Sequence, residues 1–122
     1  MSRVDWPIGR LAEADLAPLS LFFKSFSKGK TFYGDMDLFH WKIWRNPNRP
    51  GFVNAIRVES KIVSTTSLTP KKLWFDGRPI IGAEIGDTYT DPGHLRKGMF
   101  AQLINRTRAD AHEAGLEYVY GL

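Results

Sequence analysis

From Gly82 to Phe100 the chain reads Gly-Ala-Glu-Ile-Gly-Asp-Thr-Tyr-Thr-Asp-Pro-Gly-His-Leu-Arg-Lys-Gly-Met-Phe, and within it a strand gives way to a loop and then to a helix. The β-branched and aromatic content of Ile80–Thr90 predicts the strand. Asp91-Pro92-Gly93 ends it, because proline has no amide to donate and glycine favours a turn. From Met99 onward apolar residues recur every four positions, which predicts a helix.

The loop that enters this helix carries Arg96, Lys97 and Gly98. The start of a helix offers free amides and a dipole end of roughly +0.5 charge. Together with two cations, these groups favour the binding of a diphosphate. Many loops of the same composition bind nothing, so a plain connection is the alternative interpretation.

The run from Thr90 to Leu103 resembles the coenzyme-A motif of the GNAT superfamily of N-acetyltransferases, written Arg/Gln-x-x-Gly-x-Gly/Ala. Gly98 falls on its central glycine, and Lys97 is the cation before it. Phe100 takes the last small position, as in a bacterial branch whose motif ends Gly-Ile-Phe and which is associated with polysaccharide and amino-sugar modification. Leu95 stands at the first Arg/Gln position, a departure from the motif, and the neighbouring Arg96 is the residue that would supply the charge.

The resemblance extends over nearly the whole chain from Ile8 onward. Members of that branch share a Trp-Lys segment followed by Asn-Pro, an extra hairpin, an Asp-Thr pair within a strand and a late strand ending Val-Tyr-Gly. Here the matching residues are Trp41-Lys42-Ile-Trp-Arg-Asn46-Pro47, the turn Asp76-Gly77, Asp87-Thr88 and Val119-Tyr120-Gly121.

The resemblance implies an α/β fold with a mixed, mainly antiparallel twisted sheet, flanking helices and a splayed pair of parallel strands, Ile80–Thr90 and Leu116–Tyr120. It implies that acetyl-CoA lies in the wedge between them, with the backbone of Tyr89 and Thr90 against its pantetheine. The diphosphate cradle would comprise Leu95, Arg96, Lys97, Gly98, Met99, Phe100 and Ala101. A bulge at Gly86 would create the splay, and the alternative is that Gly86 makes room for a packed aromatic ring.

Acetyl transfer to an amine needs a base that deprotonates an ammonium group. Glu84 and Asp87 are the candidate carboxylates. Their odd separation places them on opposite faces of a regular strand, and a bulge at Gly86 would change that parity. The resemblance favours Asp87, which precedes a threonine in the branch. The alternatives for Asp87 are a structural hydrogen-bonding role or direct binding of the acceptor.

The composition fits a single domain, here residues 1–122, because 43% hydrophobic and 25% charged residues are ordinary for a globular protein. The absence of cysteine excludes disulfides and thiol chemistry and is compatible with a cytoplasmic location. We see no membrane-spanning run and no signal peptide. The three histidines have no metal-ligand spacing, so we expect no metal; they are His40, His94 and His112.

The net charge of +4 suggests an anionic ligand, but the basic residues are scattered along the chain. Nucleic-acid-binding proteins more often gather them on one element, so this class is disfavoured.

The other elements that we expect are a strand over Trp6–Leu11, a helix over Leu16–Phe26 capped by Asp15, a helix from Asp35 or Asp37 through Trp44, a hairpin of Phe52–Val58 and Ile62–Leu68, a short strand Leu73–Phe75, and an end of the last helix at Ala114-Gly115.

The resembled fold continues after its Val-Tyr-Gly strand with a helix, which carries the tyrosine that protonates the thiolate, and with a closing strand pair. This chain ends at Leu122, so we expect a partial domain: a truncated or fragmentary sequence, or a naturally short protein. The outer edge of Leu116–Tyr120 would then be unpaired, which predicts a homo-oligomer or a complementing chain at that strand.

Three functions follow. The first is an acetyl-CoA-dependent N-acetyltransferase, or the N-terminal portion of one, acting on an amine such as an amino sugar. The second is a non-catalytic coenzyme-binding or assembly module that needs a partner chain. The third is a small basic nucleic-acid-binding protein. Among the tryptophans, Trp74 beside an exposed hairpin is the one to test for sugar stacking, although core or lid packing is commoner.

Overall fold

The computed structural model describes residues 4–27 and 36–121 of the chain. Two helices precede a run of three long strands, and a third helix precedes a last short strand. The elements are β1 (Ile8–Arg10), the 3-10 turn η1 (Glu13–Asp15), α1 (Leu16–Ser27), α2 (Met36–Ile43), β2 (Phe52–Val58), β3 (Lys61–Phe75), β4 (Arg78–Thr90), the 3-10 turn η2 (Pro92–His94), α3 (Met99–Glu113) and β5 (Val119–Tyr120).

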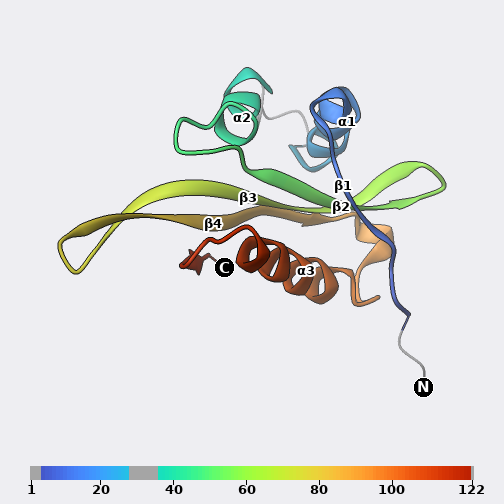
Figure 1. Ribbon diagram of the computed structural model, residues 1–122. Helices are drawn as coiled ribbons and strands as arrows, with labels where there is room; N and C mark the ends of the chain where they lie inside the picture. The colour runs from blue at the N-terminus through green and yellow to red at the C-terminus, as the bar shows by residue number, and fades with distance from the viewer. Residues whose placement is uncertain (1–3, 28–35, 122) are drawn as a thin grey trace.

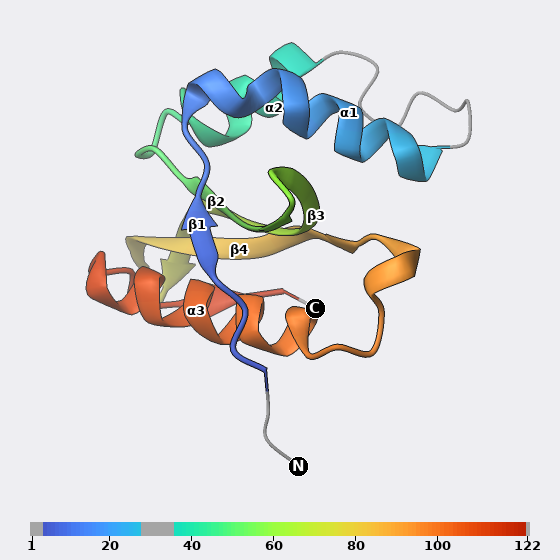
Figure 2. The same cartoon turned by 90° about the vertical axis from the view of Figure 1, so that its right-hand side faces the viewer.

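The described strands form one sheet in the order β1-β2-β3-β4-β5. The pairs from β1 to β4 are antiparallel, whereas β4 and β5 are parallel. Helices α1 and α2 cover one face of the twisted sheet and α3 covers the other (Figures 1 and 2). This is the predicted α/β fold with a mainly antiparallel sheet and a parallel pair formed by its last two strands.

Each face of the sheet has its own hydrophobic core. On the α1/α2 face, Leu19, Phe23 and Phe39 pack against Val53 of β2. On the α3 face, Met99 and Leu103 of the helix pack beneath the strands, and further along the helix Ala111 packs beside Ile85 of β4. These contacts run along α3 and fix the helix beneath the sheet. They thereby also fix the end of the loop that joins β4 to α3 (Figure 2).

Strand β3 runs without a break through Pro70, which corrects the expectation of two pieces, Ile62–Leu68 and Leu73–Phe75. Pro70 lies opposite Ala83 of β4. The amide of Ala83 donates to the carbonyl of Tyr118 on its other side, so the missing amide of Pro70 removes no hydrogen bond from the ladder. The β3–β4 hairpin therefore extends beyond the rest of the sheet (Figure 1) and closes at Asp76-Gly77, both with positive φ.

Strand β5 approaches β4 closely at two glycines. A Cβ atom on Gly82 would lie 2.6 Å from the carbonyl oxygen of Tyr118, and one on Gly121 would collide with the carbonyl of Ile85. Glycine is therefore required at these two contacts. Beyond Ile85, β4 continues to Thr90 without a paired residue of β5 among those described, which leaves one edge of its last residues open.

Some boundaries differ from those expected. β1 is limited to Ile8–Arg10, and β5 to Val119–Tyr120 rather than Leu116–Tyr120. Asp15 does not cap α1, because it ends a 3-10 turn in which its carboxylate accepts from the amide of Ala12. Asp35 lies outside the described residues, and α2 begins at Met36. The end of α3 is as expected, with Gly115 at a φ of 83°. Among the described residues, no helix has both the length and the apolar character needed to cross a membrane.

Candidate active site on strand β4

A β-bulge interrupts β4 next to the predicted position. Thr65 pairs with Tyr89 and Ser67 with Gly86, so Asp87 and Thr88 together face the single residue Thr66. Asp87 has a φ of 47°, an uncommon conformation for a residue with a side chain. The bulge therefore lies one residue beyond Gly86. A Cβ atom on Gly86 would meet no described atom within 4 Å, so Gly86 does not make room for a packed aromatic ring of the described chain.

The side chain of Asp87 is buried, with an exposed fraction of 7%, and lies between two donors. The Ser67 hydroxyl donates to Asp87 Oδ2 over 2.6 Å, and Lys42 Nζ donates to the same oxygen over 2.7 Å. The hydroxyl of Thr65 also donates to the backbone carbonyl of Asp87. Burial raises the pKa of the Asp87 carboxyl to about 6. A carboxyl with this pKa is suited to accepting a proton near neutral pH.

Lys42 comes from α2. It belongs to the Trp-Lys and Asn-Pro segment of the resemblance, to which the sequence alone assigned no function. Asn46 explains that motif physically, because its amide donates to the carbonyls of both Lys42 and Pro70 and so ties the end of α2 to β3. Burial lowers the pKa of Lys42, while the nearby charge of Glu84 raises it. The motif could have pointed to Lys42, but its contact with Asp87 depends on the packing of α2.

Glu84, the second candidate carboxylate, is half-buried on the same face of β4 as Asp87. It lies opposite Thr69 of β3 and pairs with Tyr120 of β5 on the other side. Burial and the charge of Glu84 both raise the pKa of Tyr120. Glu84 and Tyr120 thus lie where the parallel strand pair ends.

The loop from β4 to α3 has the form expected of an anion cradle. Gly98 is the N-cap of α3 at a φ of 82°, and no side chain of the described residues caps the first amides of the helix. Arg96 also has positive φ, at 63°. A Cβ atom on Gly98 would only reach ordinary contact with Gln102 Nε2, at 3.5 Å, so described atoms do not crowd this side of Gly98. These features fit a diphosphate.

The predicted cradle residues separate into two groups. Met99 is buried in the core, so only its backbone faces the cradle. The side chains that are exposed at the surface belong to Leu95, Arg96, Lys97, Phe100 and Ala101.

Two sets of hydrogen bonds brace the loop. The Asp91 carboxylate accepts from the amide of Gly93 and lies 3.1 Å from His94 Nδ1, a contact that lowers the pKa of Asp91. On the far side, the indole of Trp6 donates to the carbonyl of Lys97 over 2.7 Å. Sequence reasoning gave no role to Trp6, since it lies 91 residues from Lys97 in the chain.

Tyr89 and Thr90 differ in what they offer a ligand. The ring of Tyr89 packs against Phe23 and Phe26 of α1. The amide of Asp91 donates to Val63 of β3, and backbone groups alternate in direction along a strand. The backbone of Thr90 therefore points to the open edge of β4, whereas that of Tyr89 points toward β3. This alternation favours Thr90 as the backbone partner of a ligand at the open edge.

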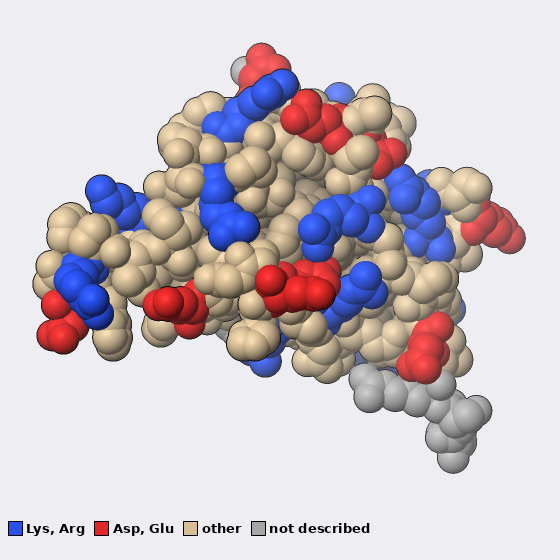
Figure 3. Space-filling model, in the orientation of Figure 1, with Lys and Arg blue, Asp and Glu red and all other residues tan. Residues whose placement is uncertain are grey.

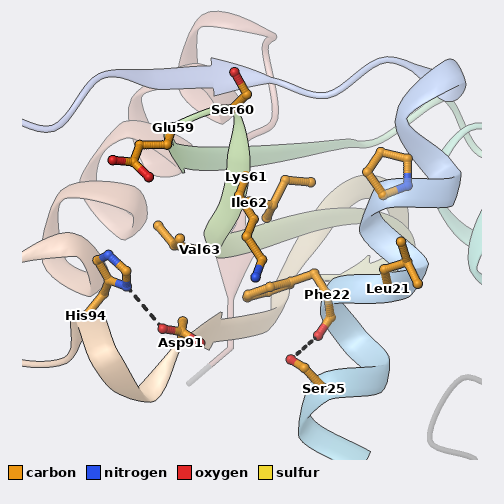
Figure 4. Close-up of a pocket in the computed structure, with 11 residues that line it drawn as sticks. Leu21, Phe22, Ser25, Glu59, Ser60, Lys61, Ile62, Val63, Asp91 and His94 are labelled. Carbon is orange, nitrogen blue, oxygen red and sulfur yellow. Dashed lines mark hydrogen bonds and ion pairs between the residues drawn. The ribbon is translucent and has the colours of Figure 1, made fainter.

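A cavity of about 530 Å³ lies between α1, the β2–β3 turn and η2 (Figure 4). Phe22, Leu21 and Ile62 form its apolar walls, and Lys61 and His94 reach it from opposite elements (Figure 4). None of the predicted site residues lines it. The described residues contain no group of three or more acidic, histidine or cysteine side chains that could hold a metal ion.

The described residues carry both signs of charge on the face shown in Figure 3. On the face shown in Figure 3, acidic side chains lie between the lysines and arginines. The ion pairs between described residues include two at Asp110, with Arg10 and Arg106. Nothing on this face has the continuous basic surface that a nucleic-acid backbone would contact.

The solved structures to which this chain is similar include acetyltransferases. An aminoglycoside acetyltransferase from an uncultured soil metagenomic sample, in complex with trehalose, matches with a TM-score of 0.70 and 25% identity over 95% of this chain and 76% of that one. The same enzyme in complex with sisomicin matches with 26% identity and a TM-score of 0.69, over the same shares of the two chains. Glucosamine-6-phosphate N-acetyltransferase from Arabidopsis thaliana shares the fold, with a TM-score of 0.70 and 16% identity over 98% of this chain and 82% of that one.

A search of the curated proteins finds no match. The family model described as "Acetyltransferase (GNAT) domain" matches residues 19–122. This region contains the bulged strand β4, the uncapped start of α3 and the parallel β4–β5 pair. The chain therefore belongs to the GNAT acetyltransferase family.

Proposed function

We propose that this chain binds acetyl-CoA and transfers its acetyl group to an amine, as an N-acetyltransferase or as the N-terminal portion of one. The observation that carries the proposal is the open start of α3, where Gly98 and the cations Arg96 and Lys97 follow the open edge of β4 along the chain. The buried carboxyl of Asp87 lies on that same strand, three residues before Thr90. Binding groups and a candidate base thus follow one another along a single strand and loop.

Different residues would contact the pantetheine and the diphosphate of acetyl-CoA. The backbone of Thr90 would pair with the pantetheine amides, with Tyr89 beside it, and the amides of Gly98 to Ala101 would hold the diphosphate. Arg96 and Lys97 would neutralise its charge, and the exposed side chains of Leu95 and Phe100 would border it. When bound, acetyl-CoA supplies the acetyl group as an activated thioester.

Asp87 would accept the proton that an acceptor ammonium must lose before its nitrogen can attack a carbonyl carbon. Its pKa of about 6 leaves the carboxyl mostly ionised at pH 7, yet more basic than an exposed aspartate. Glu84 is the alternative base, because it is half-buried on the same face. Either carboxylate would also attract a cationic acceptor.

The acceptor class in this proposal is an amine such as an amino sugar. The relative that matches with 26% identity was solved in complex with sisomicin, and its title calls it an aminoglycoside acetyltransferase. Two carboxylates on one face of β4 suit a ligand that carries ammonium groups. We also propose a cytoplasmic location, in keeping with an intracellular co-substrate and a chain without cysteine.

Calorimetric titration of the 122-residue protein with acetyl-CoA tests the proposal most directly. We expect saturable one-site binding that adenosine alone does not reproduce, because the diphosphate provides the charged contacts. Binding followed by release of free CoA in the presence of amino sugars would support catalysis. Binding without turnover over a broad panel of amines would favour a non-catalytic coenzyme-binding module, and no binding would overturn the proposal.

A further inference from the structure

We infer that Lys42 and Ser67 are positioning residues for Asp87, which keep its carboxyl ionised and fix its direction in the site. The inference rests on the proposed function in one respect, that Asp87 is the base. It adds one residue from α2 and one from β3 to a site otherwise built from β4 and the loop after it. Both residues act through Asp87 rather than on the substrate.

The two contacts converge on one atom. Lys42 Nζ and Ser67 Oγ lie 2.7 Å and 2.6 Å from the same oxygen, Asp87 Oδ2. An ionised carboxylate only accepts hydrogen bonds, and the ammonium can only donate them. Two donors on Oδ2 therefore favour the ionised form of the carboxyl. They also fix the plane of the group, and with it the direction of its other oxygen.

The backbone prepares both contacts. Ser67 lies opposite Gly86, immediately before the bulge that turns Asp87 toward α2. Lys42 is placed by Asn46, whose amide joins the carbonyls of Lys42 and Pro70. Only 27% of the Lys42 side chain is exposed, so water competes little with the carboxylate for the ammonium. An ion pair in such a place orients its members better than an exposed pair does.

Other titratable groups lie around the pair of Lys42 and Asp87. β4 contributes the phenol of Tyr89 near Asp87 and the carboxyl of Glu84 near Lys42, and β5 contributes Tyr120 near Glu84. β3 adds Lys71, which is close enough to lower the pKa of Lys42. From α1 the aromatic rings of Phe23 and Phe26 reach Tyr89, and α3 lies on the other face of the sheet.

Burial opposes ionisation of Asp87 and raises the pKa of its carboxyl. Between Lys42 and Lys71, Lys42 is the lysine in direct contact with the carboxyl. Without Lys42, the pKa of the Asp87 carboxyl would rise, and a smaller fraction of the group would be ionised at neutral pH and able to accept a proton. The pairing thus adjusts the base to the pH at which it must work.

The test is a titration of Asp87 followed by the carbon-13 signal of its carboxyl group, on the protein without co-substrate. In Lys42→Met, which keeps the side-chain length, the pKa of Asp87 should rise by about one to three pH units. Ser67→Ala should raise it by less, and Lys42→Arg should keep it near the original value. The control is Lys72→Met, which removes the same charge from an exposed position of β3 beside Trp74. That variant should leave Asp87 unchanged.

An unchanged titration of Asp87 in folded Lys42→Met would overturn the inference. If Lys42→Met does not fold, Ser67→Ala decides in its place, since a pKa that stays constant there would equally overturn it. The pH profile of kcat/KM separates the inference from the proposed function. If the acid limb moves with the carboxyl titration, both stand. If the carboxyl titration moves and the limb does not, Lys42 still controls the charge of Asp87, but Asp87 is not the base.

Discussion

Glu84 and Asp87 lie on the same face of β4 although they are three residues apart, a separation that places residues on opposite faces of a regular strand. The bulge at Asp87 and Thr88 causes this, because Asp87 adopts a φ of 47° and turns its carboxyl toward Lys42 of α2. Glu84 interacts with the same lysine. The strand thus presents two carboxylates to one side, and their roles can be separated by substitution.

Replacing Asp87 with asparagine should lower turnover by roughly 10²–10⁴-fold and leave acetyl-CoA binding largely intact, because the amide cannot accept the proton. The measurement is steady-state kinetics with an acceptor found in the amine screen, together with calorimetry for binding. Glu84→Gln is the matched control, with an expected loss of less than tenfold. Near-normal turnover in folded Asp87→Asn would transfer the base role to Glu84 or to a water molecule.

Asp87 should also make stability depend on pH. The folded pKa of about 6 is higher than the value near 3.9 of an unfolded aspartate, so the folded state binds this proton more tightly. The contribution of this group therefore falls as pH rises from about 4 to about 6, by at most about 3 kcal/mol, and is constant above that range. Urea unfolding of the original protein and Asp87→Asn at pH 4.5, 5.5 and 6.5 checks this. The stability difference between them should change across the series, and a constant difference would show that the carboxyl titrates normally.

Some elements of the fold could be predicted from the sequence, and others could not. The last helix begins at Met99 and ends before Gly115 as predicted, since the four-residue period and the positive φ of glycine are local properties. The Asp76-Gly77 turn and the strand Phe52–Val58 are also confirmed, because turn and strand patterns are local properties of the sequence as well. The continuity of β3 through Pro70 was missed, because whether a proline interrupts a strand depends on which side its missing amide faces.

The candidate site was accessible from sequence only in part. Gly98, Arg96 and Lys97 follow one another in the chain, so a motif could identify them. The contact of Lys42 with Asp87 joins residues 45 apart, and it exists only because α2 packs over the bulge. No local sequence pattern specifies a contact between two residues so far apart in the chain. The bulge itself was expected at Gly86, yet Asp87 adopts the unusual conformation, held there by hydrogen bonds from Thr65 and Ser67.

Gly98→Asp should weaken acetyl-CoA binding at least tenfold, or about 1.4 kcal/mol. The substitution places a side chain at a φ of 82°, which favours glycine, and adds a negative charge where the diphosphate would bind. Gly77→Asp is the control, because it imposes the same change at a φ of 75° on the remote hairpin turn. Calorimetry on both variants, after a thermal melt to confirm folding, gives the comparison. Equal affinities in the two variants would remove Gly98 from the cradle.

The 122-residue chain should self-associate through β5, most simply as a two-fold dimer. β5 is the last strand of the sheet, and the register of Ala83 with Val119 directs the amide of Val119 to the outer edge. Val119→Pro removes that amide and should give a monomer in light scattering at micromolar concentration. Val119→Ala, which keeps the amide, should remain associated. A monomeric original protein, or a dimer unaffected by the proline, would place the interface elsewhere or remove it.

The indole of Trp6 and the carbonyl of Lys97 carry a practical consequence for anyone who trims this protein. The family match begins at residue 19, so an expression fragment designed on it would lose Trp6, β1 and the Arg10 partner of Asp110. Trp6 contacts the loop before α3, Arg10 of β1 contacts the helix itself, and the amide of Trp6 also bonds Gln102 in the first turns of that helix. The segment before the matched region thus works as a strap across the cradle. A fragment starting at residue 19 should keep strands β2 to β5 and yet hold the cradle loosely.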